Sequence, residues 1–182
     1  MRIWLLTSTT FGTWLPGDRR GSVTSVRDPL ASVRIEHDLP GEPYEDSIPE
    51  LAESARLSMN GPAVFLDAVK AEIVARQFRE TAAYREWTIR ALAIMYNHFH
   101  IVVEVPGNPS PGKLLGDFKS YASRSLNRTF GELPTSWWTH DGSKRILKDE
   151  LAVANAIRYV LEKQPNPLVV WHPEMDCARS GG

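Results

Sequence analysis

Residues 97–105 constrain the fold of this chain more than any other segment. Their sequence, Asn-His-Phe-His-Ile-Val-Val-Glu-Val, places two histidines one residue apart at the head of an apolar, β-branched run. Because strand side chains alternate between the faces of a sheet, His98, His100 and Glu104 share one face, opposite Phe99. The segment therefore predicts a strand whose imidazoles point the same way and can converge on one ion or one phosphate.

A His-x-His pair has a second interpretation that the segment alone leaves open. Two half-buried histidines hydrogen-bonded to their neighbours would show the same pattern. The rest of the chain has to decide between them.

Composition describes an ordinary globular protein of 182 residues, with 42% hydrophobic and 24% charged residues. That length fits one domain, 1–182, with a sizeable core. Cys177 is the only cysteine, which excludes a disulfide framework or a zinc site built on several thiolates and favours a reducing, cytoplasmic compartment. We find no charged-then-apolar leader and no long apolar span, so neither secretion nor membrane insertion is expected.

Charge is unevenly distributed although the formal net charge is -1. Residues 1–61 hold six basic and nine acidic side chains, whereas residues 113–148 hold seven basic and three acidic ones. A local basic surface of this kind can hold a phosphate backbone despite a neutral total, although a solvated face of mixed charge would look the same.

Hydrophobic periodicity predicts a ferredoxin-like α+β sandwich, an antiparallel sheet with helices on one face, followed by a C-terminal helix. An irregular acidic insertion is expected at about residues 15–61, with short helical turns. The elements expected are strands at 2–10, 87–96 and 98–105, helices at 63–84 and 110–130, a strand or ribbon within 131–148, and a last helix that Asp149 caps and that ends before Pro165.

Two tyrosines compete for a chemical role. Tyr159 falls nearly opposite the apolar stripe of the last predicted helix, among polar residues, where it is available for chemistry or lies over a neighbouring element. Tyr121 borders the apolar stripe of its own helix, which favours packing. Trp137 and Trp138 could stack on unpaired bases, or one ring could lie in the core and the other at its rim.

Several of these motifs together resemble a known family. Asn97-His98-Phe99-His100 before an apolar strand, Phe118-Lys119-Ser120-Tyr121 in a basic helix, and Arg158-Tyr159-Val160 late in the chain are similar to the single-tyrosine HUH transposases, in particular the REP-associated tyrosine transposases. Phe11 to Asp18 and the tryptophan pair also resemble members. Each motif is loose, but their order and spacing are fairly specific.

The resemblance implies a nuclease domain that cuts and rejoins single-stranded DNA near hairpins in a cytoplasmic, nucleoid-associated setting. His98 and His100 would hold a divalent metal, Mg²⁺ or Mn²⁺, against the scissile phosphate. Tyr159 would be the nucleophile, giving a 5′-phosphotyrosine link and a free 3′-hydroxyl. A homodimer is one arrangement, with Tyr159 acting in its own subunit or in a partner.

The chain departs from the family pattern at Lys163. An asparagine or glutamine usually stands there, one turn after the tyrosine, and completes the metal site. A lysine would repel the ion unless it turned away or lost its proton. Gln164 is the replacement we favour, because Pro165 disfavours helical geometry at residue 164 and lets the amide swing round. Glu162 and Asn155 are the other candidates.

A phenol is mostly protonated at neutral pH, so Tyr159 needs a cation or base nearby to act as a nucleophile. Two other functions fit the sequence: a structure-selective DNA-binding protein that no longer cuts, which Lys163 favours, and a hydrolase of small phosphodiesters using Glu104 with the histidines. For the DNA surface we expect the following basic residues: Lys119, Arg124, Arg128, Lys144 and Arg145.

Overall fold

The computed structural model describes residues 1–18, 25–27, 34–36 and 48–175. By its internal contacts the chain divides into two compact units, Met1–Phe11 with Val64–Gly182, and Gly12–Ala63. The predicted irregular segment lies within the second unit, and its residues 19–24, 28–33 and 37–47 are outside the described part of the chain.

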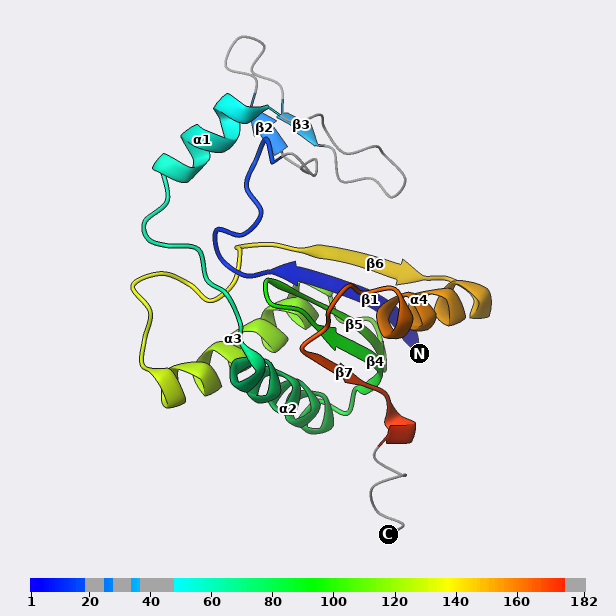
Figure 1. Ribbon diagram of the computed structural model, residues 1–182. Helices are drawn as coiled ribbons and strands as arrows, with labels where there is room; N and C mark the ends of the chain where they lie inside the picture. The colour runs from blue at the N-terminus through cyan, green and yellow to red at the C-terminus, as the bar shows by residue number, and fades with distance from the viewer. Residues whose placement is uncertain (19–24, 28–33, 37–47, 176–182) are drawn as a thin grey trace. The chain divides into compact units, whose positions relative to one another are not determined.

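A five-stranded antiparallel sheet forms the centre of the first unit (Figure 1). Its strand order is β6-β1-β5-β4-β7, and every neighbouring pair is antiparallel. The strands are β1 (Arg2–Thr9), β4 (Thr88–Ile94), β5 (His98–Val105), β6 (Ser143–Leu147) and β7 (Val169–Trp171). The histidine strand β5 is therefore central, paired on both sides.

Chain order and strand order together define the fold. β1, α2 (Ala68–Tyr84), β4, β5, α3 (Pro111–Phe130) and β6 follow one another as strand, helix, strand, strand, helix, strand. With β1 and β5 in the middle of the sheet, this is the ferredoxin-like arrangement. The predicted α+β fold class is confirmed.

Each helix of the first unit begins at a side chain that accepts a hydrogen bond from an early backbone N–H. Asp67, Ser110 and Asp149 accept from the amides of Lys70, Lys113 and Ala152 and so start α2, α3 and α4 (Glu150–Glu162). The helix predicted to begin at residue 63 therefore begins at 68, because the cap lies at Asp67.

The two faces of the sheet have separate hydrophobic cores. Helices α2 and α3 lie side by side on one face (Figure 1), where Phe78 packs against Phe99 and Phe118 with ring centroids 4.8 and 5.1 Å apart. Helix α4 covers part of the other face, where Val102 of β5 packs with Val160. The alternation predicted for residues 98–105 is what divides β5 between these cores.

Strand β7 is the strand of the first unit that sequence analysis missed, as it missed the short strands at Ser25–Arg27 and Arg34–Glu36 in the second. Three residues are too few for a period-2 pattern to show, and the strand forms because Val169 to Trp171 pair with the end of β4. Of the strand or ribbon predicted within 131–148, only β6 is a strand in the structure. Trp137 and Trp138 are both buried, with 4% and 2% exposure. The prediction that one ring lies on the rim, or stacks on a base, is wrong.

The second unit contains a two-stranded antiparallel ribbon, β2 (Ser25–Arg27) with β3 (Arg34–Glu36), and helix α1 (Pro49–Leu57). Gly17 has φ +78°, and a Cβ there would lie 2.4 Å from the carbonyl oxygen of Ile48, so the turn requires glycine. In the described parts of both units, no helix combines the length and apolarity needed to cross a membrane.

Candidate active site

The two histidines of β5 lie together on the face of the sheet that α4 covers. Their ring centroids are 5.1 Å apart, with the ring planes at 83°. His100 is 7% exposed and His98 is half-buried at the start of the strand. The alternation of the strand thus gathers the imidazoles as the sequence predicts.

Each imidazole has a hydrogen-bond partner at Nδ1. The Thr7 hydroxyl lies 2.6 Å from Nδ1 of His100, because Thr7 is its register partner on β1. The amide oxygen of Asn97 lies 2.7 Å from Nδ1 of His98. These contacts hold both rings in place through their Nδ1 atoms.

Burial, and after it the neighbouring His98, lower the pKa of His100 to about 3, although the Gln164 side chain acts in the opposite direction. His100 is therefore neutral at physiological pH. A neutral imidazole retains the lone pair that metal coordination requires.

Tyr159 reaches the histidines from α4. Its ring centroid lies 5.2 Å from that of His100, with the ring planes at 70°, and the residue is 43% exposed. The helix buries Ala156 and Val160 and leaves Tyr159 off that stripe. A phenol at the edge of a buried imidazole, open to solvent, is accessible to a DNA strand.

Gln164 lies beside His100 and Tyr159 because α4 ends at Glu162. Lys163 is the C-cap, its backbone N–H donating to the carbonyl oxygen of Tyr159, and Gln164 lies outside the helix. The Gln164 Nε2 donates to the same carbonyl at 3.0 Å. The amide, and not the exposed Lys163, is thus the group next to His100.

The remaining alternatives at this site have other partners. Asn155 accepts a hydrogen bond from Arg158, and Glu104 forms an ion pair with Arg90. The Glu104 carboxylate is thus paired with an arginine of the neighbouring strand β4. This pairing weighs against a hydrolase in which Glu104 acts together with the histidines. Glu162 is exposed near the end of α4.

Tyr121, the rival tyrosine, lies on the other side of the sheet. It belongs to α3, is half-buried, and carries the Arg124 guanidinium over its ring at 5.2 Å. This is a packing arrangement, as its place beside the apolar stripe indicates.

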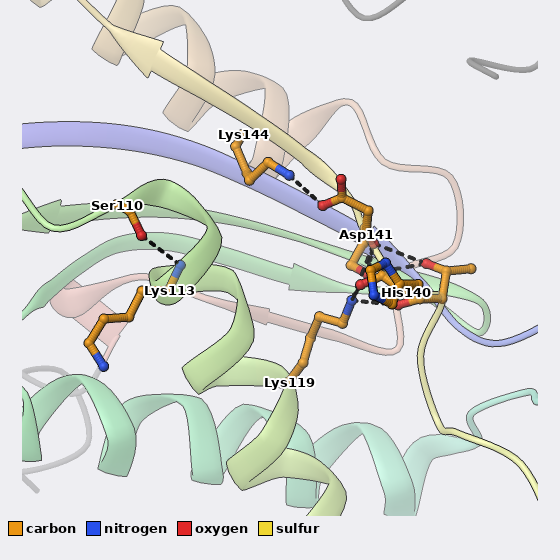
Figure 2. Close-up of polar contacts among 8 residues, drawn as sticks. Ser110, Lys113, Lys119, His140, Asp141 and Lys144 are labelled. Carbon is orange, nitrogen blue, oxygen red and sulfur yellow. Dashed lines mark hydrogen bonds and ion pairs between the residues drawn. The ribbon is translucent and has the colours of Figure 1, made fainter. Parts of the chain in front are cut away.

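Lys119 and Lys144 lie around one loop, which Figure 2 shows. The Lys119 ammonium donates to three backbone carbonyls, those of Thr139, His140 and Asp141, while Lys144 pairs with the Asp141 carboxylate. An ammonium has three N–H donors, so Lys119 has none left for a phosphate in this arrangement. Its position serves the loop rather than a ligand.

Arg145 is the member of the predicted DNA surface that lies on the histidine face. It is exposed on β6 opposite Leu5, two residues before Leu147, and both leucines pack in the core under α4. Arg124 and Arg128 are exposed on α3, which covers the opposite face. The structure therefore separates the five predicted basic residues between the two faces.

The donor set decides whether a metal fits here. No cluster of three His, Cys, Asp or Glu side chains occurs in the described ranges. Two imidazole nitrogens and one amide oxygen remain, a set that leaves positions open for phosphate oxygens and water. Such an arrangement suits a weakly held catalytic ion rather than a closed structural site.

Comparison with known proteins identifies the relevant part of the chain. Residues 62–144 match the family described as "Transposase IS200 like". The match covers 83 of the 182 residues, and over that segment the chain is similar to the IS200-like transposases. The resemblance that the motifs indicate is thus confirmed, and the match supports a transposase-type function in DNA processing. The matched segment includes both histidines and ends before Tyr159, so only the geometry of the structure brings the tyrosine to the site.

One solved structure, that of a REP-associated tyrosine transposase bound to a REP hairpin, aligns with 87% of this chain at 9% sequence identity and a TM-score of 0.48. The chain spans 64% of the length of that protein. None of the curated proteins matches the chain.

Thr7 and Asn97 are the site residues that sequence reasoning missed. Asn97 stands within the quoted motif, directly before His98, and its short polar side chain was the available signal. Thr7 carries no local signal, because only the pairing of β1 with β5 places it beside His100.

Proposed function

We propose that this protein is a metal-dependent single-stranded DNA endonuclease and strand transferase that acts through a 5′-phosphotyrosine intermediate near DNA hairpins. The observation that carries the proposal is the meeting of Tyr159 with His100, whose ring centroids lie 5.2 Å apart although 59 positions separate the residues. The transposase family of residues 62–144 supplies the reaction class.

In the proposed reaction the Tyr159 hydroxyl oxygen attacks the phosphorus of a DNA phosphodiester. The new O–P bond forms as the bond to the 3′-oxygen breaks, and the phenolic proton is balanced by the proton gained by the departing 3′-hydroxyl. The 5′-phosphate stays on Tyr159, which conserves the phosphodiester for a later attack by a 3′-hydroxyl. That conservation distinguishes strand transfer from hydrolysis.

His98, His100 and the amide oxygen of Gln164 would hold the Mg²⁺ or Mn²⁺ ion. When bound, the ion supplies Lewis-acid polarisation of a phosphate oxygen and orientation of the phosphate. The protein's own part is positional: neutral His100 presents a lone pair, Gln164 links the end of α4 to the ring, and α4 carries the phenol. Arg145, exposed on the same face, is our candidate for a DNA phosphate contact.

The substitution Tyr159→Phe tests the nucleophile. We expect covalent protein–DNA adduct to fall below detection on SDS gels, with Mn²⁺ and labelled hairpin oligonucleotides that carry randomised single-stranded flanks. Hairpin affinity, measured by fluorescence anisotropy, should change less than about threefold because the lost hydroxyl is one group among many contacts. Mass spectrometry of the native adduct should locate the phosphate on Tyr159.

Tyr121→Phe is the matched control and should form the adduct at the native level. Adduct formation by Tyr159→Phe would remove Tyr159 as nucleophile. A native chain that shifts the hairpin but never nicks it would favour the DNA-binding function, and cleavage with no protein-bound intermediate would favour a hydrolase.

A further inference from the structure

Two half-exposed aromatic side chains stack on each other beside the tip of the β4–β5 hairpin. The rings of Phe65 and Tyr96 have centroids 5.8 Å apart and planes 13° from parallel, and the residues are 53% and 51% exposed. In the core, by contrast, Phe99 and Trp138 meet edge to face at 88°. We call Phe65 and Tyr96 the aromatic platform. About half of each ring is open to a further flat partner.

The segment before α2 fixes the Phe65 ring in this position. The backbone N–H of Val64 donates to the Phe11 carbonyl at 2.9 Å, and that of Leu66 donates to the Tyr96 carbonyl at 2.7 Å. Leu66 itself is buried, at 4% exposure. Phe65 thus lies between two anchored residues, one of which is bonded to the residue that carries the other ring. A platform held in this way loses little conformational entropy when a ligand binds.

Tyr96 comes from the same hairpin tip as the histidine site. The backbone N–H of Met95 donates to the His98 carbonyl at 2.8 Å, so that Tyr96 and Asn97 form the tip. The Asn97 amide turns to His98, whereas the Tyr96 ring turns to Phe65. Two residues of chain span at most about 7 Å between Cα atoms. The aromatic platform and the histidines therefore lie at the same end of the sheet.

A single strand of DNA held at the candidate active site has unpaired bases on both sides of the bound phosphate. Proteins hold such bases against exposed aromatic rings. A separation of about 7 Å corresponds to about two steps of a stacked strand, at about 3.4 Å per nucleotide. The aromatic platform is thus within reach of a nucleotide next to that phosphate. Trp137 and Trp138, the rings that the sequence suggested for this role, are buried.

We propose that Phe65 and Tyr96 form a stacking platform for one unpaired base of the single-stranded DNA that lies at the candidate active site. The inference rests on the proposed function for the identity of the partner. Because every base has a flat aromatic face, the contact contributes affinity and fixes the position of the strand without selecting a sequence.

The test compares two fluorescent oligomers of equal length and charge, an oligothymidylate and its fully abasic counterpart. Anisotropy in EDTA at one fixed salt concentration measures binding apart from cleavage. Tyr96→Ala and Phe65→Ala should each weaken binding of the oligothymidylate by about 5- to 100-fold, the usual effect of losing one base–aromatic stack. Binding of the abasic oligomer should change by less than about twofold, because it has no base to stack.

Two further variants control for the ring and for its place. Tyr96→Phe keeps the ring and should bind the oligothymidylate within about twofold of the native affinity. Tyr84→Ala removes a ring that is 76% exposed at the opposite end of α2, and it should leave the native affinity unchanged. Thermal unfolding verifies that each variant is folded.

Single abasic sites along the single-stranded flank of a hairpin then locate the stacked base. At one position, loss of the base should weaken binding by the native protein and leave binding by Tyr96→Ala unchanged, because that variant has already lost the stack.

Native affinity of both alanine variants for the oligothymidylate would overturn the proposal, as would an equal loss of affinity for the two oligomers. A native dimer that Tyr96→Ala converts to a monomer, with base-dependent binding unchanged, would also overturn it, since a second copy would then cover the platform. A protein that shows platform-dependent binding but forms no DNA adduct would contradict the proposed chemistry alone. An adduct formed with base-independent binding would contradict this inference alone.

Discussion

At the scale of single residues, burial determines the charge state of the candidate site. His100 lies in the sheet with 7% exposure, and its low pKa means that the folded protein resists protonation of this ring. The unfolded chain binds that proton with an ordinary pKa near 6.5. The difference makes the free energy of unfolding depend on pH.

We expect the metal-free protein to lose about 2 kcal/mol of stability from this group between pH 7 and pH 5. The folded pKa is about 3, so the unfolded state gains the proton first, and stability falls as pH drops below 6.5. Urea unfolding in the presence of a chelator measures the change. His100→Gln should remove this contribution, whereas His140→Gln, at an exposed position, should keep it. Equal pH dependence in native protein and His100→Gln would contradict the prediction.

At the scale of elements, one half-buried cation, that of Lys119, ties α3 to the loop before β6. Lys119 contributes its ammonium to three carbonyls of residues 139–141, and Ser8 of β1 donates to the carbonyl of Asp141 as well. This loop leads into β6 at Ser143 and therefore helps to position Arg145 two residues later. The sequence indicated a phosphate contact for Lys119, since a basic helix residue looks the same whether its charge meets a carbonyl or a phosphate.

Lys119→Met should lower the free energy of unfolding by about 2 kcal/mol, because three carbonyls lose a charged donor. Lys113→Met removes the same charge from the same helix, where the lysine forms an exposed pair with Asp117, and should cost about 0.5 kcal/mol or less. Thermal and urea unfolding of the two variants measure the difference. If Lys119→Met were as stable as the native protein yet bound DNA poorly, Lys119 would belong to the DNA surface after all.

At the scale of the whole molecule, the chain leaves and re-enters the first unit at adjacent points. The backbone N–H of Val64 donates to the carbonyl oxygen of Phe11 at 2.9 Å, although 52 residues separate them. A segment whose ends meet in this way can be shortened with little change in closure entropy. We therefore expect residues 12–63 to behave as an insertion into the first unit.

Replacing residues 12–63 by a short Gly-Ser linker should yield a folded chain that keeps the far-ultraviolet spectrum of the sheet and a cooperative unfolding transition. Because Tyr159, His98 and His100 belong to the first unit, adduct formation should also persist. Circular dichroism and the adduct assay measure both. If the chain lacking residues 12–63 did not fold, the two units would form one cooperative domain.

The sequence by itself determined the fold class, the split of the histidine strand between two faces, and the exposed position of Tyr159, because each follows from a local period of 2 or 3.6 residues. Hydrophobic periodicity did not show where the helix caps place the helix ends, nor did it show the three-residue strand β7. Only tertiary structure could show that Thr7 reaches His100, that Gln164 rather than Lys163 lies next to the ring, and that Lys119 meets carbonyls. These depend on strand register and on where α4 ends, which are set by pairing and packing between segments far apart in the chain.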